Sequence, residues 1–488
     1  MPPLIAPKDT LLLAFNLPQF HPIPENDAWW GAGFTEWTNV SRGRPLFRGH
    51  YQPHLPADLG FYDLRVPETR AHQATLAREA GLTGFIYFHY WFNGRRLLDT
   101  PVNEILRLKQ PDYPFCLCWA NEPWSRNWDG QNQAVLMPQL YSPEDDLCHI
   151  EWLLQAFSDE RYIKIDGRPL FLIYRPSQLP DIRGTVARWR EAAERRGFPG
   201  LFLGAVRAFP EEFSDPAGFE LDASVEFRPN GIDCGDRLRS DDPLDIGYRL
   251  HRVWDYSQMV SSALALPIPD YPFFPGVCPS WDNSVRRSAG GVIFREATPE
   301  KYGTWLREVL MRETLRSQQP SIVVVNAWNE WAEGNHLEPC QRWGHGYLAA
   351  TREAIDRARS HRDGVAKLRQ RQVVAVDPEF RLLGNVDERS SASGRLLLRG
   401  WCVEAESLVP PEILLFAVRQ EDGRFILLSP VKHQRLARTD VVQALGAPQV
   451  LTSGWAGQVP LSDDHADPTR IQVLAFRTRD GAAACLPG

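Results

Sequence analysis

Two glutamates three residues apart are the strongest candidates for chemistry in this sequence. Glu330 and Glu333 follow the apolar run Ile322–Ala327, which is typical of a buried strand. If the chain turns helically beyond it, positions i and i+3 face the same way, so both carboxylates can reach one site. Trp328 and Trp331 lie beside them, and apolar walls raise the pKa of the more buried acid. Two carboxyl groups with different pKa values can act as acid and base, as glycoside hydrolysis requires.

An exposed helix surface is the alternative explanation for a Glu-x-x-Glu pair. Such a surface usually carries Lys and Arg between the acids. Here the neighbours are Asn329, Ala332 and Gly334, and an apolar run precedes them. The sequence therefore favours a catalytic pair over a solvated helix face.

The elements that would position this pair alternate between strands and helices. Such alternation predicts a parallel sheet covered by helices, and eight strands predict closure into a (β/α)₈ TIM-type barrel. Helices are expected over Pro67–Ala80, Pro143–Phe157, Arg183–Arg196 and Pro299–Ser317. Strands are expected over Leu11–Phe15, Gly84–Tyr90, Phe115–Trp119, Leu170–Tyr174, Leu201–Ala205, Ala223–Phe227, Gly276–Pro279 and Ile322–Ala327.

Polar and aromatic clusters follow the ends of five of these strands, and the carboxyl ends of barrel strands form the active-site face. The chain is rich in Trp, with 17 copies, many of them beside Asn, Asp or Glu. Aromatic faces suit the C–H faces of sugars, while amides and carboxylates suit their hydroxyls. The predicted substrate-binding residues are Glu36, Trp37, His89, Tyr90, Trp91, Trp119, Asn121, Glu122, Trp124, Glu226, Trp281, Asp282, Asn326, Trp328, Asn329, His336 and Glu338.

Two further groups have open interpretations. Glu122, in Asn121-Glu122-Pro123, resembles the acid of many barrel glycosidases and is the main rival for a catalytic role. Substrate binding, or an ion pair with Arg126, also explains it, and binding is favoured. The Arg286-Arg287 pair is explained equally well by an anionic sugar or phosphate and by solvated surface charge.

Composition and charge exclude several classes of protein. The net charge is -7 with both signs mixed, which argues against a nucleic-acid partner. No apolar run is long enough to span a membrane, and no secretory signal is seen. The eight scattered cysteines, including buried Cys116 and Cys118, fit reduced thiols, so a cytoplasmic location is expected. No metal-binding spacing is present, so neither a metal nor a cofactor is expected.

The pattern changes near residue 360. Arg352–Arg371 is a basic helical stretch, and short strand-like runs separated by turn formers follow it. These runs predict a small all-β sandwich. The expected domains are a barrel over 1–360, a linker over 361–378 and a sandwich over 379–488.

Several motifs in this order resemble the WbsX-like proteins of the glycoside hydrolase family 99-like group. The resemblance covers roughly 10–355 and is carried by Leu17–Pro22, Gly33–Trp37, Trp119–Trp124 and Asn326–Gly334. It implies a (β/α)₈ barrel and retaining chemistry on α-mannosides. It also implies that Glu330 assists the sugar's 2-hydroxyl as an internal nucleophile, through a 1,2-anhydro sugar, while Glu333 is general acid and then base. Ala332 stands where that family's motif has His.

Three functions follow from these observations. The first is a glycoside hydrolase, possibly endo-acting, on a bacterial surface polysaccharide. The second is a glycosyltransferase in O-antigen, capsule or rhamnan synthesis, as WbsX-like proteins are commonly described. The absence of a Gly-x-Gly-x-x-Gly or Asp-x-Asp motif argues against a nucleotide-sugar site and favours hydrolysis. The third is a carbohydrate-binding protein without turnover, which would not need both Glu330 and Glu333.

Overall fold

A computed structural model gives the architecture. It describes residues 10–125, 135–315, 320–369, 373–392, 395–411, 413–420, 422–428, 432–436, 438–447, 450, 453–460, 468–477 and 482–486. These residues form two compact units. The first contains most of 10–352, and the second contains 257–266, 303–316 and the chain from 353 onward.

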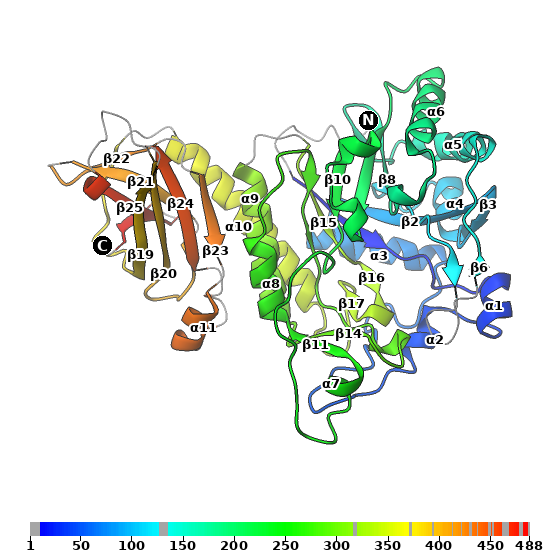
Figure 1. Ribbon diagram of the computed structural model, residues 1–488, viewed down its shortest axis with the longest axis horizontal. Coiled ribbons are helices and arrows are strands. Elements are labelled where there is room, and N and C mark those ends of the chain that lie inside the picture. The colour runs from blue at the N-terminus through cyan, green and yellow to red at the C-terminus, as the bar shows by residue number, and fades with distance from the viewer. Residues whose placement is uncertain are drawn as a thin grey trace. The chain divides into compact units, whose positions relative to one another are not determined.

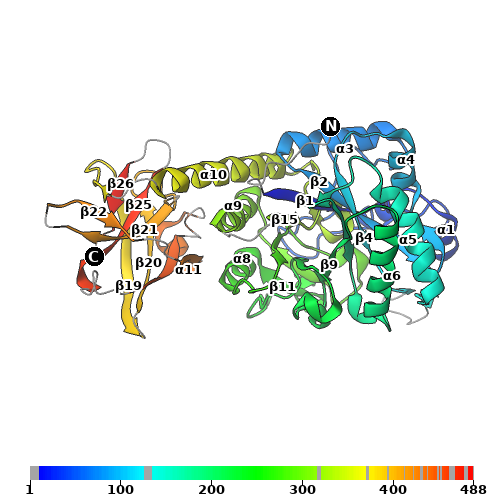
Figure 2. The same ribbon diagram turned by 90° about the horizontal axis from the view of Figure 1, so that it is seen from above.

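The first unit is a closed parallel barrel with eight strand positions (Figures 1 and 2). The seventh position is divided into β12 and β13 on either side of Pro275; β12 pairs with β10 and β13 with β15, which closes the ring. All eight predicted strands are confirmed. Their bounds are β1 Leu11–Asn16, β2 Gly84–Phe92, β4 Phe115–Trp119, β8 Arg168–Ile173, β9 Phe202–Arg207, β10 Ala223–Glu226, β12 Phe273–Phe274, β13 Gly276–Val277 and β15 Ile322–Val325.

Burial on both faces explains why these strands read as continuous apolar runs. Every residue of β1, β2 and β15 is buried. Aromatic rings fill the barrel interior: the ring of Phe15 lies 5.4 Å from that of Phe88 and 5.1 Å from that of Phe227, measured between centroids. The interior is therefore packed, and a substrate can approach only the strand ends.

Helices follow most strands and cover the barrel. Helices α3, α4, α5 and α6 lie outside the strands in Figure 2. Helix α3 begins with Pro67 and ends at Gly81, whose φ of 89° suits glycine. All four predicted helices are confirmed to within two residues. The bounds are α1 Pro24–Trp30, α2 Glu36–Val40, α3 Pro67–Ala80, α4 Thr100–Leu108, α5 Pro143–Phe157, α6 Ile182–Arg195, α7 Gly247–Leu250, α8 Tyr256–Ala265 and α9 Pro299–Leu315.

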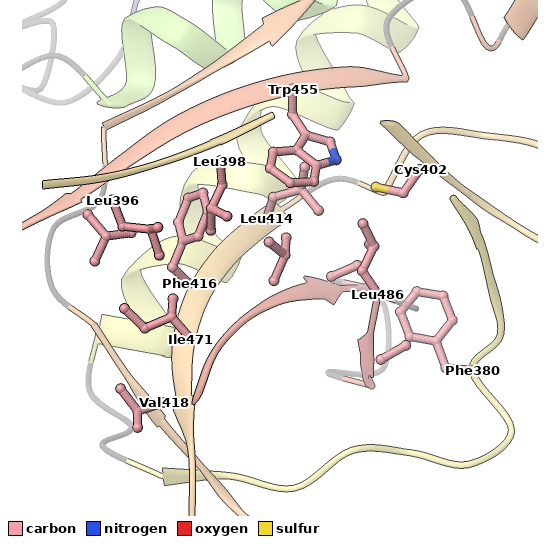
Figure 3. Close-up of a cluster of buried hydrophobic side chains, with 14 residues drawn as sticks. Phe380, Leu396, Leu398, Cys402, Leu414, Phe416, Val418, Trp455, Ile471 and Leu486 are labelled. Atoms are coloured by element: carbon pink, nitrogen blue, oxygen red, sulfur yellow. The ribbon is translucent and has the colours of Figure 1, made fainter. Parts of the chain in front are cut away.

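The second unit contains two antiparallel sheets, as the predicted sandwich requires. Side chains from both sheets share one core, among them Leu398 and Trp455 from one sheet and Leu414 and Phe416 from the other (Figure 3). One sheet contains β18 Val373–Val374, β22 Phe425–Leu427, β21 Ile413–Arg419, β25 Ile471–Phe476 and β26 Ala483–Cys485; the other contains β19 Leu382–Ala392, β20 Arg395–Glu404, β24 Gly454–Pro460 and β23 Lys432–Leu436.

Helix α10, Gly346–Arg369, is longer than the sequence indicated, so the expected linker 361–378 begins inside a helix. A short helix, α11 Thr439–Leu445, interrupts the otherwise all-β region. The predicted domain limits stay a prediction. None of the helices in the described ranges combines the length and apolar composition that crossing a bilayer requires.

Candidate active site

The segment after β15 folds into a tight hairpin that carries both candidate glutamates. Strands β16, Asn329–Glu330, and β17, Asn335–His336, pair through Glu330 and Asn335 (Figure 1). A 3₁₀ turn, Trp331–Glu333, connects them. Glu330 ends β16 and Glu333 ends the turn, and both side chains leave the hairpin on the same side, toward Arg286. The helical turn expected from the sequence is thus a single 3₁₀ turn.

Gly334 closes this turn where a side chain cannot fit. Its φ is +57°, and a Cβ there would lie 3.0 Å from Asp282 Cβ and 3.2 Å from the Asp282 nitrogen. The Asp282 nitrogen donates a 2.6 Å hydrogen bond to the Glu333 carbonyl. The hairpin therefore packs closely against Asp282, which holds the backbone of Glu333 in place.

Replacing Gly334 with Ala should both destabilise the protein and reduce turnover. The left-handed backbone alone costs about 1–2 kcal/mol, and the added methyl pushes Asp282 away from Glu333. Gly344→Ala is the matched control, because Gly344 has a φ of +52° and open space around its Cα. Thermal unfolding should show a loss in both variants, and a turnover assay should show a loss only for Gly334→Ala. Equal turnover in both would contradict this account.

Arg286 brings the two glutamates together. It ends the 3₁₀ turn Ser284–Arg286, beyond β13. Its Nη2 lies 3.0 Å from Glu330 Oε2, and its Nη1 lies 2.6 Å from Glu333 Oε1. Glu36, in the first turn of α2, accepts a 2.7 Å hydrogen bond from Nε of the same guanidinium. Both candidate carboxylates therefore converge on neighbouring nitrogens of one cation.

Burial and crowding perturb the titration of this group. The side chain of Glu36 is inaccessible, that of Glu330 is 7% exposed and that of Glu333 is 17% exposed. Burial, reinforced by the neighbouring carboxylates, raises the pKa of both Glu330 and Glu333, and Arg286 only partly offsets it. Burial opposes the charge on Arg286, but the three carboxylates raise its pKa above the usual value. Burial and the mutual repulsion of the carboxylates therefore outweigh the arginine, and the pKa of each of the two glutamates stays above its ordinary value.

This raised carboxyl pKa should make stability depend on pH. A carboxyl whose folded pKa exceeds its unfolded pKa contributes stability below the unfolded pKa, and that contribution is lost as pH rises through the folded pKa. Glu330→Gln removes this titration, so its Tm should exceed that of the wild type by a margin that grows from acidic to alkaline pH. Thermal unfolding across that range measures the margin, with exposed Glu191→Gln on α6 as control. A margin that shrinks as pH rises would contradict the assignment.

A buried polar network lies beneath the hairpin. Glu338 accepts hydrogen bonds from Trp331 Nε1 at 2.6 Å, Gln73 Nε2 at 2.6 Å and Tyr62 Oη at 2.8 Å. Burial raises the pKa of Glu338 to about 7, although these donors act in the opposite direction. His336 stacks on Trp331 with centroids 3.7 Å apart. These contacts favour a role for Glu338 and His336 in positioning the hairpin.

Three other predicted binding residues are also buried around the hairpin. Asn329 is inaccessible; its Oδ1 accepts from the Leu17 nitrogen at 2.7 Å and its Nδ2 donates to the Leu17 carbonyl at 3.0 Å. Trp328 is also inaccessible. Trp37 donates to the Tyr62 carbonyl at 2.8 Å. Their burial does not support direct contact with a sugar.

An aromatic wall lies on the β2 side of the carboxylates. Tyr90 is close enough that the charge of Glu330 adds to the burial that raises its pKa. The ring of Trp124 packs edge-on against Tyr90 at 5.1 Å and against Trp29 at 5.9 Å. Tyr174, directly after β8, has a pKa raised by burial and by nearby carboxylates, including Glu333. Tyr90 and Trp124 therefore remain predicted substrate-binding residues, and Trp29 and Tyr174 join them.

Three predicted residues face away from this site. His89 and Trp91 alternate with inward-facing Phe88 and Tyr90 along β2, so their side chains leave the barrel on the outer face. His89 Nε2 lies 3.0 Å from His149 Nε2, and Trp91 donates to Asp145 Oδ1 at 3.0 Å, both on α5. Trp119 is 1% exposed and packs against His149. These side chains contact α5 on the outer side of the barrel, and their contact with substrate stays a prediction.

Asn121 and Glu122 are held by the neighbouring strand. Asn121 Nδ2 donates to the Arg175 carbonyl at 2.8 Å, and its Oδ1 accepts from the Arg175 nitrogen at 2.7 Å. The Arg175 side chain pairs with Glu122 at 2.9 Å. Burial raises the pKa of Glu122, and the paired arginine opposes this rise. Arg126, the partner considered from the sequence, lies outside the described residues.

Glu226 and Asn326 join strand ends in the same way. Glu226 pairs with Arg228 and accepts from the Gly276 nitrogen at 2.8 Å. Asn326 Nδ2 donates to the Arg228 carbonyl at 2.7 Å. Through these contacts Glu226 and Asn326 connect the end of β10 to β13 and β15.

Asp282 anchors the segment that carries Arg286. Its Oδ2 contacts His50 Nε2 at 2.6 Å and accepts from Gln52 Nε2 at 2.9 Å, while its Oδ1 accepts from the Ser284 nitrogen at 3.0 Å. Burial acts to raise the pKa of Asp282, but the contacts with His50 outweigh it and lower that pKa. Trp281 is 8% exposed and lines a small cavity beside Asp282. Both residues support the active-site segment from beneath.

Sequence reasoning did not identify Arg286 as the partner of the glutamates. Its signal was present, since the Arg286-Arg287 pair follows shortly after the polar cluster at the end of the seventh strand. Tyr174 carries a similar signal as the residue directly after a buried strand. Within the described ranges, no group of three His, Cys, Asp or Glu side chains is arranged as a metal site.

Comparison with known proteins identifies relatives across most of the barrel. The family described as Glycosyltransferase WbsX matches residues 12–351. Two proteins named Uncharacterized protein WxcX, from Xanthomonas campestris pv. campestris strains B100 and ATCC 33913, are each 46% identical over 353 residues, which are 71% of this chain and 50% of the relative. This chain thus spans about half the length of the curated relatives it matches.

Solved structures with low sequence identity also match. A glycoside hydrolase-like protein is 15% identical, with a TM-score of 0.44 over 71% of this chain and 94% of that protein. The GH99 endo-alpha-mannosidase from Bacteroides thetaiotaomicron is 16% identical, with a TM-score of 0.46 over 73% of this chain and 99% of that enzyme.

Proposed function

We propose that this chain, which belongs to the Glycosyltransferase WbsX family, is a retaining glycoside hydrolase that acts on a bacterial surface polysaccharide through Glu330 and Glu333. Membership in this family makes it a carbohydrate-active protein. The observation that carries the finer proposal is the convergence of the two carboxylates on neighbouring nitrogens of Arg286. A buried pair of carboxyl groups with raised pKa values can supply one acid and one base, as glycosidic bond cleavage needs.

In the proposed first step, Glu330 accepts the proton of the sugar's 2-hydroxyl, and that oxygen attacks the anomeric carbon. Glu333 donates its proton to the departing glycosidic oxygen as the bond breaks, which leaves a 1,2-anhydro sugar. In the second step, Glu333 accepts a proton from water, whose oxygen attacks the anomeric carbon and opens the anhydro ring. Glu330 returns its proton to the 2-oxygen. Two displacements at one carbon restore its configuration, so the enzyme is retaining.

The exposure of Glu333 supports its role at the departing oxygen, whereas Glu330, whose pKa is raised by burial, must be ionised against Arg286 before it can act as the base. Glu333 is the more exposed carboxylate and therefore the one better able to reach a departing oxygen and then a water molecule. Glu330 is more enclosed, at 7% exposed, and lies toward Tyr90. Arg286 stays within hydrogen-bonding distance of both and can stabilise whichever carboxylate is ionised at each step.

Transfer to a sugar acceptor is the second candidate function, and the description of the matching family favours it. The same pair can activate an acceptor hydroxyl in place of water. Incubation with a glycan panel, with and without nucleotide sugars, separates the possibilities. New reducing ends without nucleotide sugar support hydrolysis, and nucleotide release supports transfer. Binding without either product would defeat both proposals.

A further inference from the structure

A cavity of about 400 Å³ adjoins the catalytic pair and shares Arg286 with it. This volume lies within the range of about 300–1,000 Å³ that is typical of small-ligand pockets. Arg42 and Arg44, from the loop after α2, and Arg287 line the cavity beside Arg286. Its described lining contains four arginines and no carboxylate, although the whole chain carries a net charge of -7.

Three of these arginines are exposed, although Arg287 lies close enough to Glu333 to act against the rise of that carboxyl's pKa. No ion pair is recorded for Arg42, Arg44 or Arg287 with any described residue. The carboxylates Glu36, Glu330 and Glu333 instead all pair with Arg286. Like charges gathered around one hollow repel each other, so the unliganded cavity attracts an anion.

The cavity also offers an apolar surface. Trp30 and Phe34 line it, and their rings lie 5.9 Å apart with a tilt of 34°. Flat aromatic surfaces accept the C–H face of a sugar, while guanidinium groups bind carboxylates and phosphates through two parallel hydrogen bonds. The lining is thus suited to a sugar unit that carries a negative charge.

We propose that this cavity is a subsite for an anionic group, a carboxylate or a phosphate, on the sugar unit next to the reacting bond. The placement beside the bond rests on the proposed function, whereas the anion binding itself rests only on the cavity. A uronic acid would supply a carboxylate, and a sugar diphosphate would supply phosphate. Arg42 and Arg287 determine specificity in either case, because they meet the charge without touching the reacting atoms.

Isothermal titration of the full chain tests this subsite with three probes. The probes are a galacturonic acid trisaccharide, inorganic pyrophosphate and neutral mannotriose as the uncharged comparison. An anionic probe should bind at one site, more tightly than mannotriose, and added sodium chloride should weaken it. Binding of the trisaccharide alone identifies a carboxylate source, and binding of pyrophosphate alone identifies a phosphate source. Equal affinity for charged and neutral probes would overturn the proposal.

Arginine variants locate the binding. Arg42→Gln and Arg287→Gln should each weaken the anionic probe by about tenfold, the loss of one charge-assisted contact. Arg48→Gln is the matched control, since Arg48 is an exposed arginine in the same loop that does not line the cavity. Unchanged affinity in both variants would overturn the assignment, and unchanged thermal unfolding shows that they are folded.

The titrations also separate this inference from the proposed hydrolysis. They are repeated on Glu330→Gln, in which anion binding should persist or tighten, because one nearby negative charge is removed. If Glu330→Gln retains full turnover, the catalytic proposal fails while the subsite stands or falls on the arginine variants alone. Loss of the anion site in Glu330→Gln would count against the subsite.

Discussion

Replacing Glu330 or Glu333 with Gln will reduce turnover by at least about a hundredfold while the protein stays folded. Each replacement keeps the shape of the side chain but removes a group that must give up or accept a proton. Both side chains contact Arg286, and an amide oxygen can still accept that hydrogen bond. The measurement is the release of reducing ends from the glycan that the wild type cleaves.

The double variant and a control sharpen this test. When two residues take part in the same step, replacing the second costs little once the first is lost. The double variant Glu330→Gln/Glu333→Gln should therefore turn over only slightly more slowly than either single variant. Glu191→Gln, on the exposed surface of α6, should retain wild-type turnover. Glu122→Gln tests the rival assignment. If turnover is lost in Glu122→Gln while the Glu330 and Glu333 variants stay active, the acid is Glu122, after β4.

Replacing Arg286 with Gln will both abolish turnover and lower the free energy of unfolding by about 3–5 kcal/mol near neutral pH. The substitution leaves Glu36, Glu330 and Glu333 buried without their shared cation. The loss should be smaller at acidic pH, because protonated carboxyl groups no longer need that cation. Denaturant unfolding at acidic and at neutral pH measures the difference.

A compensating substitution distinguishes charge from packing. Adding Glu36→Gln to Arg286→Gln should recover part of the lost stability, since it removes one of the unpaired anions. Arg286→Lys should retain more stability than Arg286→Gln but not full turnover, because an ammonium cannot offer neighbouring nitrogens to two carboxylates in a fixed plane. A loss that is the same at every pH and is not reduced by Glu36→Gln would show that Arg286 acts mainly by filling space.

The barrel was predictable because its strands carry a strong local signal. Strands buried on both faces appear as short apolar runs, as in β1 and β15, and proline and glycine mark the ends of α3. Because both faces of such a strand are apolar, however, the sequence does not show which side chains point into the barrel and which point outward. In β2 every residue is buried, so nothing in its composition shows that His89 points outward while Tyr90 points inward.

The chemistry of the site was predictable only in part. The i,i+3 spacing of Glu330 and Glu333 indicates a shared direction, because it depends on local geometry alone. Their pairing with Arg286 joins residues 44 and 47 positions apart, and the pairing of Arg286 with Glu36 spans 250 positions. Such contacts depend on closure of the barrel, which brings the loops after different strands to one face. One sequence alone does not show that Arg286 lies next to these glutamates in space.

The contacts of Asp282 have a consequence for the rigidity of the proposed active site. The backbone nitrogen of Asp282 donates to the Glu333 carbonyl, and its carboxylate accepts from the nitrogen of Ser284, the first residue of the turn that ends at Arg286. Glu333, the proposed proton donor, and Arg286, its counter-ion, are thus both fixed by Asp282, so neither can move without the other. If the proposed function holds, this arrangement means that the catalytic residues are in place before a substrate binds, so the binding energy is not used to order them.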